Sequence, residues 1–153
     1  MRLNFLCGNH RNWLVHNPHA AVFAHTRAYE EGLELFEGHN FRAAANHAGC
    51  ALETAQILID ADGPLSDETI GRYSDAGILL VYSLLHMQED GLAARIQAGI
   101  LSHLEKMLCD LGGRQSLVDA CRRWMQFSTE TALPGFPAVP PASRAQRHSL
   151  VLN

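Results

Sequence analysis

The sequence predicts an all-α protein, an antiparallel bundle of four to five long helices. Three observations lead to this fold class. Apolar residues recur at helical spacing over several long segments. Gly, Pro, Asn and Asp gather in the short breaks between those segments. No segment shows the alternation of β-branched and polar residues that is typical of a half-buried strand.

The first helix is expected over residues 18–37 and the second over residues 41–60. Asn17 is a typical N-cap, Pro18 suits the first helical position, and Gly38 begins the break between the two helices. The second helix has the clearest apolar stripe, and because much of it is alanine, we expect close packing against a neighbour. This stripe consists of Phe41, Ala44, Ala45, Ala48, Leu52, Ala55, Leu58 and Ile59.

A third helix is expected from Ser66 or Asp67, either of which can cap it, to about Gln88. It carries two apolar stripes, which makes it either the centre of the bundle or the cover of an interface. One stripe contains Ile70, Tyr73, Gly77, Leu80, Val81, Leu84 and Met87. The other contains Ile78, Leu79, Tyr82 and Leu85.

Two more helices complete the predicted bundle. The fourth is expected over residues 92–111 and the fifth over residues 115–131, with glycines in both preceding breaks. The chain then divides into an irregular N-terminal arm (1–17), a helical bundle domain (18–133) and a Pro-rich flexible tail (134–153).

Composition narrows the function. The chain has 153 residues, 47% of them hydrophobic and 18% charged, which excludes an intrinsically disordered protein. Its net charge is −4, whereas binding to a phosphate backbone needs a positive charge or at least a basic stripe, so we expect no nucleic acid partner. No apolar run reaches membrane-spanning length, and the four cysteines form no disulfide framework, which favours a soluble cytoplasmic protein. Common enzyme motifs are absent, so a non-enzymatic protein without a cofactor is favoured.

One weak metal candidate lies in the N-terminal arm. Cys7 and His10 are followed by His16 and His19, each pair separated by two residues. A thiolate with imidazoles is a ligand set that suits zinc. The alternative is that these are simply polar residues of an irregular arm.

A second candidate lies on the predicted second helix. Arg42 and His47 resemble the R-x4–6-H ribonuclease signature of HEPN domains, which are also small helical bundles. This resemblance implies a ribonuclease or a nucleotide-binding bundle that uses these two residues. The alternative is chance, because an arginine and a histidine occur at this spacing in many helices.

The order of the elements carries a broader resemblance. Over residues 20–131 the chain resembles the flagellin-specific export chaperones, cytoplasmic four-helix bundles of bacteria. The features shared are the break at 37–40, the Asp/Gly turn at 59–63, the apolar core at 79–85 and the acidic turn at 89–91. The hairpin of the first two helices also resembles a tetratricopeptide repeat, through Gly32, Phe41, Ala44, Ala51 and Leu52.

The chaperone resemblance implies that the chain binds another protein. It would cover an amphipathic helix of that partner and so prevent the partner from assembling prematurely. The candidate partner-binding groove consists of Ile78, Leu79, Tyr82, Leu85, Leu101 and Leu108. The alternative is that this stripe is the core of the bundle or the seam of a homodimer.

Overall fold

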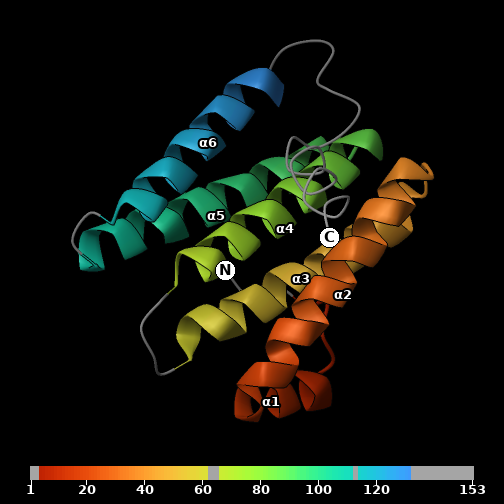
Figure 1. Ribbon diagram of the computed structural model, residues 1–153. Coiled ribbons are helices and arrows are strands. Elements are labelled where there is room, and N and C mark those ends of the chain that lie inside the picture. Colours follow the sequence, from red (N-terminus) through yellow and green to blue (C-terminus); the bar gives the residue numbers. More distant parts are fainter. Residues whose placement is uncertain (1–3, 62–65, 112–113, 132–153) are drawn as a thin grey trace, which may run out of the picture.

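The computed structural model describes residues 4–61, 66–111 and 114–131, which form six α-helices and no strand (Figure 1). Consecutive long helices run antiparallel, so the predicted all-α bundle is confirmed. In chain order the helices are α1 (Gly8–His16), α2 (Pro18–Glu37), α3 (Phe41–Asp60), α4 (Asp67–His86), α5 (Asp90–Asp110) and α6 (Gln115–Thr131).

The helix ends follow the predicted breaks with one shift. Helix α4 stops at His86 rather than Gln88, and α5 already begins at Asp90. The reason is the backbone at Gln88, which adopts a left-handed conformation with φ 61°. The N–H of Glu89 then reaches back to the carbonyl of Leu84 at 2.9 Å, closing the helix in a Schellman motif.

Helix α1 corrects the expectation of an irregular arm over residues 1–17. It has one buried residue, Leu14, so no apolar period announces it in the sequence. Leu14 packs in a small cluster with Ala21 of α2 and Ile57 of α3. This tertiary contact, rather than amphipathicity, holds the helix on the bundle.

Helix α4 is the centre of the bundle, since it packs against α2, α3, α5 and α6 (Figure 1). Gly77 allows α6 to approach closely, because a Cβ at this position would lie 2.8 Å from Cζ2 of Trp124. The buried Trp124 indole N–H donates to the hydroxyl of Ser74 at 2.9 Å. The α4–α6 contact is therefore tightly packed around Trp124, and the indole N–H has a hydrogen-bond acceptor.

Within the described residues, none of the helices combines the length and the apolar character needed to cross a membrane. The predicted Pro-rich tail at 134–153 lies outside the described residues.

Candidate functional site

The predicted partner-binding stripe is not an exposed groove. Ile78, Leu79 and Tyr82 are 2%, 0% and 0% exposed, because neighbouring helices cover α4 on these faces. Leu85, Leu101 and Leu108 are partly buried and pack against the same core. The expectation of a groove is thus corrected to the alternative that the stripe belongs to the core of the bundle.

The structure does not bring Arg42 and His47 to a common site. Five residues apart on α3, they lie about 140° apart around the helix axis at 3.6 residues per turn. Arg42 is exposed, whereas His47 Nδ1 lies 3.1 Å from a carboxylate oxygen of Glu31 on α2. Neither residue lines any of the pockets described below. Within the described residues, the structure therefore does not bring these two side chains together, and the ribonuclease role stays a prediction without support from this geometry.

The candidate zinc ligands are also dispersed. Cys7, His10, His16 and His19 are all exposed. The ring of His16 is engaged with the carbonyl oxygen of Asn12, which lies 2.8 Å from Nδ1. Among the residues that the structure describes, no group of three or more His, Cys, Asp or Glu side chains is arranged to hold a metal ion.

The most distinctive feature of the surface is a polar cleft between α2 and α4, with a volume of about 330 Å³. This volume lies at the lower end of the range of small-molecule sites. The helical period puts four residues of each helix on the lining face. Gly71 lines both this cleft and a smaller one between α4 and α6, and a Cβ there would meet no atom within 4 Å. The lining residues are His25, Thr26, Tyr29, Glu30, Glu68, Gly71, Arg72 and Asp75.

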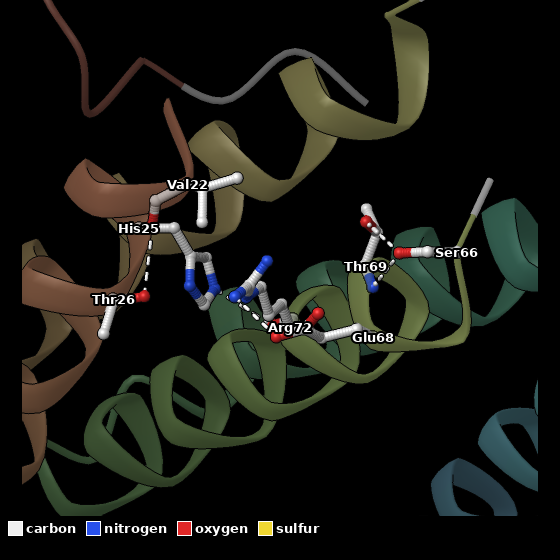
Figure 2. Close-up of polar contacts among 7 residues, drawn as sticks. All are labelled: Val22, His25, Thr26, Ser66, Glu68, Thr69 and Arg72. Atoms are coloured by element: carbon white, nitrogen blue, oxygen red, sulfur yellow. Dashed lines mark hydrogen bonds and ion pairs between the residues drawn. The ribbon is translucent and has the colours of Figure 1, made fainter. Parts of the chain in front are cut away.

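His25 of α2 is the most deeply placed polar group of the cleft, at 3% exposure. Its Nε2 lies 3.3 Å from the backbone carbonyl oxygen of Arg72 on α4 (Figure 2). A carbonyl only accepts, so Nε2 carries the proton. Burial lowers the pKa of His25 to about 4, against the hydrogen bond to that carbonyl, so the ring is neutral at pH 7. Nδ1 is therefore a bare acceptor, and it has no partner among the described residues.

Tyr29 lies one turn further along α2 and is 4% exposed. Its ring stacks on His25, with the ring centroids 6.1 Å apart. The hydroxyl is buried and has no hydrogen-bond partner among the described residues. Burial, followed by the negative charge of Asp75, raises its pKa, so the hydroxyl stays protonated. An unpaired buried hydroxyl costs about 1–3 kcal/mol, which a fold does not keep without a compensating reason.

The charges of the cleft come mainly from α4. Glu68 and Arg72 form an ion pair at 2.7 Å, one helical turn apart. Asp75 is hydrogen-bonded and ion-paired with Arg123 of α6. Burial raises the pKa of Asp75, while Arg123 acts in the opposite direction. Two of the three carboxylates of the lining are therefore in ion pairs, Glu68 with Arg72 and Asp75 with Arg123. Glu30 adds one further negative charge, so the cleft has a small net negative charge.

A second polar cluster lies where the N-terminal segment meets α3. The carboxylate of Glu53 is 2% exposed and accepts the backbone N–H of Leu6 at 2.7 Å. Arg11 lies 4.0 Å from the same oxygen. The adjacent cavity measures about 30 Å³, room for about one water molecule. Glu53 therefore serves to fasten the N-terminal segment to the bundle.

Sequence reasoning did not find the α2–α4 cleft. The spacing of polar residues is the one sign of the cleft in the sequence. His25 and Tyr29 are four residues apart, and Glu68, Arg72 and Asp75 are separated by four and three residues. Each set reads as one helix face, but the sequence does not show that the two faces meet.

Comparison with known proteins returned no match: no protein-family model fits the chain, and neither curated proteins nor solved structures show significant similarity.

Proposed function

We propose that this chain is a non-enzymatic protein-interaction module that binds another protein along the face formed by α2 and α4. The single observation that carries the proposal is the cleft itself, where Nδ1 of His25 and the hydroxyl of Tyr29 are buried without a partner among the residues that the structure describes. Both residues line the cleft, so a group bound in it is placed next to them.

The rim of the cleft favours a protein over a small molecule. Phe23 is 72% exposed, unusual for a phenylalanine. It lies three residues before Thr26, which lines the cleft, so the two share a face of α2. An apolar anchor beside a polar cleft is typical of protein interfaces, whose centres are enriched in aromatic side chains.

The narrower expectations keep their status as predictions. An amphipathic helix stays the expected binding element of the partner, and an export chaperone of the bacterial cytoplasm stays the expected role. Self-association as a homodimer is the alternative use of the same face. The separation of Arg42 and His47 gives no support to a ribonuclease.

Affinity purification with two leucine variants tests the proposal. Gly71→Leu fills the cleft, whereas Gly91→Leu places the same side chain at a helical glycine of α5 that also has open space around it. The expected result is one protein that co-purifies from native cells with the wild-type chain and with Gly91→Leu but not with Gly71→Leu. Equal recovery with all three chains, or no enrichment over a tag-only control, contradicts the proposal.

A further inference from the structure

We propose that the α2–α4 cleft receives the cationic side chain of a lysine or arginine presented by the partner protein. This inference rests on the proposed function and specifies the chemistry that the cleft recognises. It follows from the hydrogen-bonding groups and charges that line the cleft, taken one at a time.

The unpaired groups of the cleft need a hydrogen-bond donor. The geometry at Arg72 fixes the proton of His25 on Nε2, so Nδ1 offers only a lone pair. The hydroxyl of Tyr29 can accept as well as donate. Thr26 already donates its hydroxyl proton to the carbonyl of Val22 at 3.1 Å, which leaves its oxygen as an acceptor (Figure 2). An acceptor-only ligand such as a carboxylate therefore has little to bind here.

The charges of the cleft favour a cation. Glu30, Glu68 and Asp75 line it as carboxylates, and Arg72 is the one cation among the lining residues. Arg72 is paired with Glu68 at 2.7 Å, and Arg123 of α6 is paired with Asp75. These two ion pairs balance, so Glu30 supplies the excess negative charge that a ligand cation meets. An ammonium brings three donors and a guanidinium five, all charge-assisted when they meet a carboxylate.

The surroundings of the cleft favour a side chain over a free amine. A free amine makes no use of Phe23, which is 72% exposed and three residues before Thr26 on α2. A polypeptide can place a basic side chain in the cleft and an apolar side chain on Phe23 at the same time.

Nuclear magnetic resonance of the ¹⁵N-labelled full chain provides the test. The probes are a blocked leucine–glycine–lysine peptide, its twin with norleucine in place of lysine, and n-butylamine. The lysine peptide is expected to shift the Nδ1 resonance of His25 and to bind about tenfold more tightly than either other probe, the worth of one charge-assisted hydrogen bond. Gly71→Leu should abolish the shift, and Gly91→Leu should preserve it. Tyr29→Phe should weaken the lysine peptide about threefold or more, the effect of one hydrogen bond.

Each of the other outcomes contradicts a particular part of the inference. Equal binding of the norleucine twin overturns recognition of a cation. Equal binding of n-butylamine overturns the assignment to a protein side chain and assigns a free amine. No shift at His25 with any probe overturns the inference altogether. The proposed function survives all three results if Gly71→Leu still loses the co-purifying protein, so the two failures are distinguishable.

Discussion

The two flanks of the central helix α4 differ in how they treat buried polar groups. On the flank that faces α6, Trp124 fills the space above Gly77 and its N–H is paired with Ser74 at 2.9 Å. On the flank that faces α2, His25 and Tyr29 are equally buried, but Nδ1 and the hydroxyl have no partner in the described part of the chain. The first flank is closed around Trp124, and the second is open around His25. Nearer the start of α4 the first flank also has a cleft of about 150 Å³, so the comparison concerns the surroundings of Trp124 and of His25.

This difference shows where the fold serves stability and where it serves recognition. A closed contact gains free energy from dense packing and complete hydrogen bonding. An open contact gives up part of that free energy, and proteins keep such groups at sites where a ligand completes the bonds. Changes on the closed flank should therefore cost stability, whereas changes on the open flank should cost binding.

The largest effect is expected on the closed flank from Trp124→Ala. Loss of a buried tryptophan leaves a cavity and should destabilise the fold by about 3–5 kcal/mol. Met125→Ala is the matched control, because Met125 is the next residue and is 55% exposed. The control should change stability by less than about 0.5 kcal/mol. Urea denaturation measures both, and equal losses in the two variants contradict a closed α4–α6 contact.

The second effect is a pH dependence on the open flank. The pKa of His25 is about 4 in the folded chain and near 6.5 when unfolded, so the unfolded chain binds the proton more tightly. Stability should therefore fall as the pH drops from about 6.5 to 4, by about 3 kcal/mol from this residue. Above pH 6.5 the contribution of His25 is constant.

His25→Gln isolates this contribution, since the amide keeps a donor for the carbonyl of Arg72 but does not titrate. The variant should lose less stability than the wild-type chain between pH 7 and pH 4. Parallel stability curves for the two proteins contradict a buried, neutral His25.

The sequence predicts the flank of α4 that faces α6 better than the flank that faces α2. The bounds of α2, α3 and α6 follow from Pro18 and the glycine breaks, which act locally and are visible in the sequence. Asn17 lies at the N-cap of α2, but its side chain donates to the carbonyl of Trp13 and does not cap the helix. The two apolar stripes of α4 indicate that the helix is buried on two faces. They do not distinguish a helix at the centre of the bundle from one that covers an interface. Local chemistry and periodicity thus account for the closed flank.

The open flank could not be predicted, because its groups come from α2 and α4 and are far apart in the chain. His25 and the carbonyl of Arg72 are 47 residues apart in sequence, and α3 separates them along the chain. The sequence does not predict helix α1 for a similar reason, since Leu14 packs against residues of other helices. Both features depend on tertiary packing, which no period of the sequence encodes.

A third prediction compares the removal of one hydroxyl from each flank. Ser74→Ala leaves the N–H of Trp124 buried without an acceptor and should cost about 1–3 kcal/mol. Tyr29→Phe removes a hydroxyl that has no partner within residues 4–61, 66–111 and 114–131, and it should be neutral or stabilise the fold by about 1 kcal/mol. Thermal or urea unfolding decides, and a loss for Tyr29→Phe as large as that for Ser74→Ala argues against an open cleft.

The smallest effect compares two glycines of α4. Gly71→Ala adds a methyl group in open space and should stabilise the helix by about 1 kcal/mol. Gly77→Ala places its Cβ 2.6 Å from Cδ1 of Ile100 and should destabilise the fold by about 1–3 kcal/mol. The opposite signs are the result to look for, and the same sign for both variants contradicts the difference between the flanks.

The central claim is that the α2–α4 cleft is an acceptor site built around a neutral His25, and long-range ¹H–¹⁵N correlation of the histidine rings at pH 7 tests it most directly. The predicted result is a neutral ring with its proton on Nε2 and a bare Nδ1. A proton on Nδ1, or an imidazolium at pH 7, contradicts it.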